Sequence, residues 1–176
     1  GSMFRLTNCN KINLSNIETN GNNVKFRLLN NWGMGANPYE REHEGLFILN
    51  SQDVNVCNAS FNYFGRDGLM ILEDQDKQPV KRLSFSNCNF NYNGRDGVSW
   101  CGGEEVSFYC CNFNYNASGK IITNPASGID IEPERGAACK KGVFVTCNET
   151  TDKVITYKKL EENKRQLEFA IDAAKL

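Results

Sequence analysis

The chain has 176 residues, a formal net charge of −1 at pH 7 and a 40% share of hydrophobic residues. Its length fits one domain with a hydrophobic core. The near-balanced charge argues against a nucleic-acid-binding surface. No apolar run approaches the roughly 18 residues that a membrane-spanning helix needs. We therefore expect neither a nucleic-acid nor a membrane partner.

The N-terminal part contains short alternating segments. We interpret residues 1–3 as a remnant of tag removal, which would leave a native signal peptide invisible. Polar and apolar residues alternate over 11–16 and again over 23–28, which predicts two strands of a first repeat. An irregular insertion at 30–44 then leads into the apolar segment 45–49.

The centre of the chain repeats one pattern three times. The three copies are Val54–Tyr63, Leu83–Tyr92 and Val106–Tyr115. Each copy is followed by a strand that begins with glycine, at Gly68–Leu72, Gly97–Cys101 and Gly128–Glu132. The copies are offset by 29 and 23 residues, counted between Phe61, Phe90 and Phe113. A period in the twenties is typical of a solenoid, in which each repeat buries its apolar edge against its neighbours.

The local alternation predicts an all-β fold, a parallel β-helix of about five coils in which like residues stack about 4.8 Å apart. Three columns of like residues are expected. They are an inward phenylalanine stack (Phe61, Phe90, Phe113), a small-residue stack (Ala59, Cys88, Cys111) and an asparagine corner (Asn16, Asn58, Asn87). Asparagine suits a corner because it tolerates the left-handed backbone.

The repeats, the Asp-Gly strand entries and the run Ser127–Pro133 resemble the pectate-lyase-like superfamily over residues 4–148. Its members include polysaccharide lyases, polygalacturonase-like hydrolases, sugar epimerases and phage tailspike depolymerases. The resemblance implies a right-handed parallel β-helix whose partner is a polysaccharide or glycan. It also implies a secreted, cell-surface or virion-associated protein.

Assigning alternate residues of the Gly-led strands to the inner and outer faces suggests a catalytic pair. Residues one and three after each glycine are apolar and are predicted to point inward. The outward row changes from Phe47, Met70 and Leu72 to Asp130 and Glu132. Alternate residues of a strand lie about 6.5–7 Å apart, near the lower end of the range of about 6.5–9.5 Å for an inverting glycosidase. We predict Asp130 and Glu132 as the catalytic acid and base.

Three acids at the strand entrances form a second predicted cluster. Asp67 and Asp96, with Glu44 in the matching place, either cap local backbone or form an acidic column. Such a column would raise a carboxyl pKa, which would make Asp96 catalytic, or would hold Ca²⁺ in a lyase. Arg66 and Arg95 either contact an acidic sugar or a β-elimination centre, or form salt bridges with these acids.

Further binding residues are expected in the insertion at 30–44. Trp32 and Tyr39 would stack on a sugar, and His43 lies beside the expected groove or is simply solvated. One histidine cannot supply a zinc site, so no cofactor is expected apart from Ca²⁺ in a lyase. The eight cysteines are interpreted mainly as buried free thiols, with a disulfide as the alternative.

The segment 149–176 changes in character. Its apolar residues recur at three- and four-residue steps, which predicts an amphipathic helix. It would cap the solenoid or, alternatively, join copies into a homo-oligomer. The sequence thus predicts cleavage or modification of a polysaccharide along the Gly-led strand face. The alternative is a non-catalytic glycan-binding or structural module, such as a fragment of a tailspike or adhesin.

Overall fold

The computed structural model describes residues 1–27, 42–134 and 136–147. The predictions for Trp32, Tyr39 and the segment 149–176 lie outside these residues. Two parallel sheets make up the described fold. Sheet A contains β1 (Phe4–Thr7), β3 (Leu46–Leu49), β5 (Leu69–Leu72), β7 (Val98–Trp100) and β9 (Ile129–Ile131) in that order. Sheet B contains β2 (Asn10–Asn20), β4 (Gln52–Asn62), β6 (Lys81–Ser86), β8 (Gly103–Tyr109) and β10 (Cys139–Lys140), and β11 (Val143–Val145) also pairs with β8.

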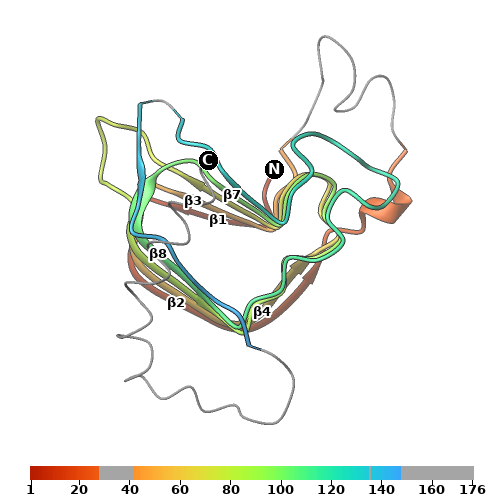
Figure 1. The fold of residues 1–176 in the computed structure, drawn as a ribbon, viewed down its shortest axis with the longest axis horizontal. Coiled ribbons are helices and arrows are strands. Elements are labelled where there is room, and N and C mark those ends of the chain that lie inside the picture. Colours follow the sequence, from red (N-terminus) through yellow and green to blue (C-terminus); the bar gives the residue numbers. More distant parts are fainter. Residues whose placement is uncertain (28–41, 135, 148–176) are drawn as a thin grey trace.

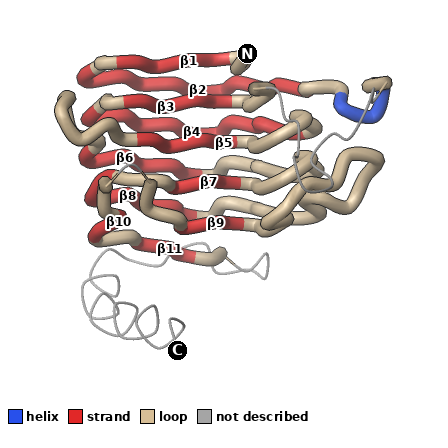
Figure 2. The backbone as a smooth tube through the Cα atoms, turned by 90° about the horizontal axis from the view of Figure 1, so that it is seen from above, coloured by secondary structure: helices blue, strands red, loops and turns tan. Residues whose placement is uncertain are grey.

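Successive strands alternate between the two sheets, so that each pair of consecutive strands is one repeat stacked on the last (Figures 1 and 2). The register confirms the proposed repeat. Ile12 lies beside Val54, and Val54 lies beside Leu83. The residues between 12 and 54 are therefore one repeat with a long insertion. This all-β arrangement of parallel sheets is consistent with a β-solenoid.

The core lies between the two sheets and is built from like residues in register. Phe61, Phe90 and Phe113 stack with centroid distances of 5.8 and 5.7 Å, as predicted. The small-residue column of Ala59, Cys88 and Cys111 also forms. The next residue of each repeat shows this, because Ser60, Asn89 and Asn112 are paired in register. The inward residues of β3 and β5 are fully buried.

Glycine precedes β3, β5, β7 and β9 of sheet A because neighbouring repeats approach closely there. A Cβ atom on Gly97 would lie 2.5 Å from the carbonyl oxygen of Gly128, and one on Gly68 would lie 2.8 Å from that of Gly97. At the other corners the chain turns through residues with positive φ. Asn16, Asn58 and Asn87 have φ values of 56°, 51° and 52°, which confirms the asparagine corner.

Three details differ from expectation. The segment predicted as a strand over 23–28 contains a 3₁₀ helix, η1 (Asn23–Lys25), because Asn23 turns inward and donates to the carbonyl oxygens of Phe64 and Tyr92. Insertions of a solenoid are expected to gather on one face, but the insertions 73–79 and 116–126 lie at opposite ends of the sheet A strands (Figure 1).

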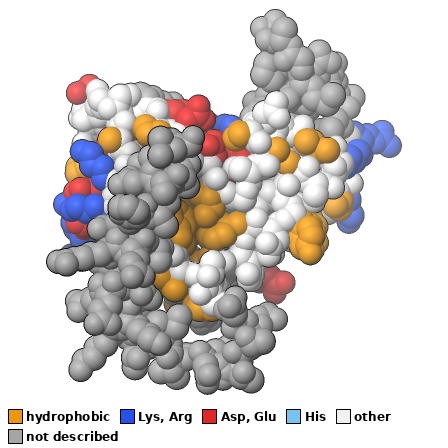
Figure 3. Space-filling model, in the orientation of Figure 1, with side chains coloured by type: hydrophobic (Ala, Val, Ile, Leu, Met, Phe, Trp, Pro, Cys, Tyr) orange, Lys and Arg blue, Asp and Glu red, His pale blue; other side chains and the backbone are white. Residues whose placement is uncertain are grey.

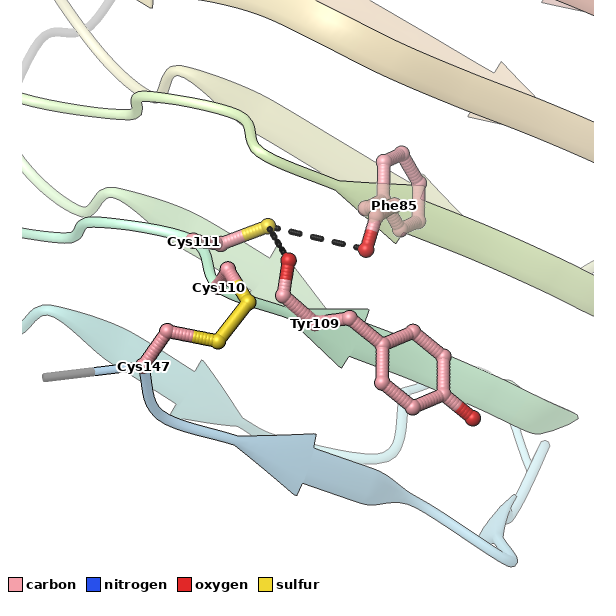
Figure 4. Close-up of a disulfide and its surroundings, with 5 residues drawn as sticks. All are labelled: Phe85, Tyr109, Cys110, Cys111 and Cys147. Carbon is pink, nitrogen blue, oxygen red and sulfur yellow. Dashed lines mark hydrogen bonds between the residues drawn. A yellow bond between two sulfur atoms is a disulfide. The ribbon is translucent and has the colours of Figure 1, made fainter. Parts of the chain in front are cut away.

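The third difference is a disulfide. Cys110 takes the corner place of the asparagines, with φ 52°, and is bonded to Cys147 (Figure 4). The six other cysteines are free thiols, as predicted, but only Cys88 and Cys101 are buried and the other four are half-buried. Cys111 points away from this disulfide, toward the carbonyl oxygens of Tyr109 and Phe85 at 3.4 and 3.6 Å.

Candidate active site on the outer face of sheet A

A column of buried acids runs along one end of sheet A. Glu44, Asp67 and Asp96 each precede the glycine of a strand, and each has a relative exposure of 0%. In the next repeat the place is taken by Ser127. Three stacked carboxyl groups without water need hydrogen-bond donors or cations beside them.

The two arginines supply those cations. Arg95 donates from Nε and Nη2 to the two oxygens of Asp67, at 2.8 and 2.5 Å, and its Nε lies 3.4 Å from Asp96 Oδ2. Arg66 Nη1 lies 3.2 Å from Glu44 Oε1. Each arginine therefore neutralises the acid of the preceding repeat. The structure shows the salt bridges that were one of the two predicted roles for these arginines.

Asp96 is also held by hydroxyl and backbone donors. Its Oδ1 accepts from the backbone nitrogen and the hydroxyl of Ser127, both at 2.8 Å, and its Oδ2 accepts from Ser99 Oγ at 3.2 Å. Burial nevertheless raises the pKa of Asp96 to about 6, and the charge of Asp67 adds to the effect. Burial likewise raises the pKa of Glu44.

The outward column of sheet A runs in register through Arg5, Phe47, Met70, Ser99 and Asp130. Its apolar members were predicted to be exposed. Phe47 and Met70 instead have relative exposures of only 6% and 7%. They pack with Leu72 and Cys101 into a second apolar cluster.

This cluster is enclosed by its own column and by neighbouring loops. The Arg5 guanidinium lies 4.1 Å from the centre of the Phe47 ring, and Met70 Sδ lies 3.8 Å from Cys101 Sγ. At the other end of the strands, Glu134 donates its backbone nitrogen to Cys101, and Gln75 bonds to the carbonyl of Gly136. The alternation of residues along a strand predicts the face to which a side chain points, but not which residues cover that face. This explains why Phe47 and Met70 are buried although they point outward.

Asp130 and Glu132 end this outward row. Asp130 in β9 is half-buried and Glu132 is exposed. The pKa of Asp130 is raised by burial, then by the charge of Glu132 and by a hydrogen bond with it, against an opposing effect of Arg95. The two carboxyl groups therefore lie near enough to affect each other's ionisation, as expected of alternate residues on one face of a strand. Figure 3 shows acidic and basic side chains gathered where the molecule is hollowed above sheet A.

His43 has a structural position. Its Nδ1 accepts the backbone N–H of Gly65 at 2.8 Å, and its ring packs between Phe26 and Phe64 at centroid distances of 4.8 and 5.5 Å. Burial lowers its pKa. Because Nδ1 accepts a hydrogen bond, it carries no proton, and the single ring proton is on Nε2. His43 therefore supports the loop as a neutral ring.

Two further columns were missed in the sequence. One is a tyrosine stack, in which the rings of Tyr63, Tyr92 and Tyr115 follow each other at 4.9 and 5.0 Å. The other is a column of charges at a corner of sheet B, made by Lys11, Asp53, Arg82, Glu105 and Lys141. Both could have been found from the repeat offsets, because each residue occupies the same place in its own repeat.

Within the described residues, no group of three or more His, Cys, Asp or Glu side chains is placed to hold a metal ion. No helix in the same part of the chain is long and apolar enough to cross a membrane. Comparison of the chain with protein-family models, with curated proteins and with solved structures found no match in any of the three.

Proposed function

We propose that the repeats are coils of a right-handed parallel β-helix and that the protein cleaves a polysaccharide on the outer face of sheet A. The observation that carries the proposal is the end of the outward column. There the row changes from a buried apolar cluster to Asp130, a half-buried acid with a raised pKa, beside the exposed Glu132. A glycosidic bond needs one protonated and one ionised carboxyl group for its cleavage.

The two carboxyls divide these roles by their surroundings. Asp130 keeps its proton to higher pH, since burial and the neighbouring charge both disfavour its ionised form. It is therefore the proton donor to the leaving oxygen. Glu132 is exposed and acts as the base that activates water. A sugar ring that enters between the two side chains breaks their mutual hydrogen bond and makes room for that water.

Asp96 contributes indirectly in this proposal, because its carboxyl group is fully buried and cannot touch a substrate. It holds Ser99, the residue beside Asp130 in the register, through a hydrogen bond of 3.2 Å. Asp67 and Glu44 hold the arginines in the same way. Asp96 is thus a positioning residue rather than the catalytic acid that the sequence suggested.

Hydrolysis is favoured over β-elimination. In a lyase an arginine would bind the substrate's carboxylate or take a proton, but Arg66 and Arg95 are already ion-paired with Glu44 and Asp67. The proposed substrate is a polysaccharide outside the cell or on a cell or virion surface. The disulfide between Cys110 and Cys147 supports such an oxidising location.

The test is a screen of purified protein against neutral and acidic polysaccharides, with new reducing ends and unsaturated-uronate absorbance both recorded. We expect reducing ends without absorbance. Asp130→Asn and Glu132→Gln should each lower the rate by about 10²-fold or more, the usual range for acid–base groups. Glu134→Gln, an exposed acid on the same loop, is the matched control and should keep the parent rate. Absorbance that survives in both variants would refute the assignment.

The non-catalytic module remains the second proposal, and one observation favours it. Glu44, Asp67 and Asp96 are fully buried, so a ligand on this side of sheet A reaches Asp130 and Glu132 but none of the three stacked acids. The pair serves binding alone if no polysaccharide yields product and if Asp130→Asn changes how strongly a polysaccharide in a native gel retards the protein.

A further inference from the structure

The tyrosine stack lies where the chain leaves sheet B, since Tyr63 directly follows β4, whereas Asp130 lies in β9 of sheet A. Tyr63, Tyr92 and Tyr115 directly follow the repeated segments, and all three have positive φ values near 60°. The ring planes are within 3° and 11° of parallel. Tyr92 and Tyr115 are 40% and 64% exposed, large values for aromatic residues in a repeat whose other rings are buried. In Figure 3 orange side chains project from a mostly white surface on the side beyond β4.

Two columns of polar residues run beside the tyrosines. In the nearer column Asn62 and Asn91 use their Oδ1 atoms to accept the backbone N–H of the next repeat, at 2.7 and 2.6 Å. In the farther column Asn89 donates to Ser60 at 3.2 Å, and Asn112 donates to Asn89 at 2.9 Å. These bonds hold the amide groups in fixed and repeating orientations.

The same arrangement leaves donors pointing to solvent in every repeat. Among the described residues, neither the hydroxyl groups of the three tyrosines nor the Nδ2 groups of Asn62, Asn91 and Asn114 make a hydrogen bond. None of these atoms is among the buried polar atoms that lack partners. Each repeat therefore presents one phenol and one amide, spaced about as far apart along the stack as the rings, at 4.9 and 5.0 Å.

We propose that this Tyr–Asn strip, made of Tyr63, Tyr92, Tyr115 and the two polar columns beside them, is a binding site for an uncharged polysaccharide chain. The strip contains no charged residue, which disfavours nucleic acids and acidic glycans. It combines aromatic surface with amide and hydroxyl groups, which suits sugar rings with apolar faces and hydroxyl edges. A regular polymer meets the same groups in several repeats at once, so weak contacts add up.

The strip lies apart from the proposed cleavage site and does not depend on it. It would hold a long chain on the surface of the protein while another part of that chain reaches sheet A. Tyr115 is at one end of the stack and is its most exposed member, at 64%, so the outer face of its ring offers a stacking surface. The largest loss on substitution is expected there.

The experiment is native gel electrophoresis of the Asp130→Asn protein through gels that contain a β-glucan, an α-glucan, a galactomannan or a galactan. We expect at least one of them to retard the protein. The double variant Tyr92→Ala/Tyr115→Ser should weaken the interaction about tenfold or more. Tyr92→Phe/Tyr115→Phe keeps the rings and should lose less. Tyr109→Ser is the matched control, because Tyr109 is a half-buried tyrosine of β8 outside the strip.

Folding is verified by thermal melts of every variant, and the single variant Tyr115→Ser, at the most exposed ring, serves if the double ring-removing variant melts early. The proposal is overturned if none of the four polysaccharides retards the protein. It is also overturned if both ring-removing substitutions leave retardation unchanged in a folded protein. A dimer in sedimentation that Tyr115→Ser dissociates would assign the strip to a second copy of the chain instead. Retardation of the Asp130→Asn protein, together with no product from the parent protein in the polysaccharide screen, would support this strip and refute the cleavage proposal.

Discussion

Two columns of charged residues connect the repeats of this protein, and they are built in opposite ways. The column at the entrance of sheet A stacks acids of one sign, Glu44, Asp67 and Asp96, all fully buried, and arginines from the next repeat neutralise the first two. The corner column of sheet B alternates in sign and is largely solvent-exposed. Arg82 bonds to Asp53 at 2.5 and 2.8 Å, and Lys141 bonds to Glu105 at 3.1 Å.

The difference teaches how burial changes the meaning of the same contact. In water an ion pair between repeats is screened and contributes little to the free energy of folding. The corner column therefore disfavours like charges in neighbouring repeats but stabilises the fold only slightly. Away from water the loss of one partner leaves a charge that nothing compensates. The buried column is therefore a fixed part of the fold, and its members are poor choices for groups that must change protonation during a reaction.

The largest effect should come from breaking the buried column. Asp67→Ala removes the carboxylate that accepts two hydrogen bonds from Arg95, whose side chain is only 14% exposed, and should lower the free energy of unfolding by about 3–5 kcal/mol. Urea denaturation followed by circular dichroism measures this. The double variant Asp67→Leu/Arg95→Met removes both charges and should recover much of the loss. A single variant as stable as the parent would show that the pair is not effectively buried.

An intermediate effect is expected from Asp96, through pH. Its folded pKa, about 6, lies above the ordinary value of 3.8, so the folded protein binds this proton more tightly than the unfolded chain does. The resulting stabilisation is complete below about pH 3.8 and is lost as the pH rises through 6. Asp96→Asn lacks this loss, so its stability relative to the parent should improve by roughly 1–3 kcal/mol between pH 4 and pH 7.

Melting temperatures of both proteins across that pH range give the comparison. Asp76→Asn, at an exposed acid of the loop after β5, should show no such crossover and serves as the control. A constant difference between parent and Asp96→Asn at all pH values would contradict the raised pKa.

The smallest effect should come from the exposed column. Asp53→Asn removes the partner of Arg82, whose hydrogen bond lowers the pKa of Asp53. We expect a slight decrease in melting temperature at low salt that disappears at high salt, since exposed pairs are screened. Melts at several salt concentrations test this. A large decrease that salt does not remove would mean that the two columns are energetically alike.

Much of the fold was predictable because the repeats carry their own register. Phe61, Phe90 and Phe113 could be aligned by their spacing, and the asparagine corner followed from residue type. The 3₁₀ helix at Asn23–Lys25 was not predictable, because it depends on two carbonyl groups that come from distant repeats.

The candidate site was predictable in its location and less so in its details. Alternation placed Asp130 beside Ser99 correctly. It could not show that Phe47 and Met70 are covered, since their cover comes from side chains along the column and from loops. The engagement of Arg95 with the acid of the preceding repeat likewise depends on side-chain reach rather than on spacing.

The alternating corner also limits how this chain can gain or lose length. From Lys11 through Asp53, Arg82 and Glu105 to Lys141, each repeat contributes one charge of the opposite sign to its neighbours. Deleting a single interior repeat, such as the one that contributes Asp53, would place two like charges side by side at the corner, which is unfavourable. Deleting or duplicating two adjacent repeats keeps the alternation intact. A change in length that adds or removes an even number of interior repeats therefore preserves the alternation of charge along this corner.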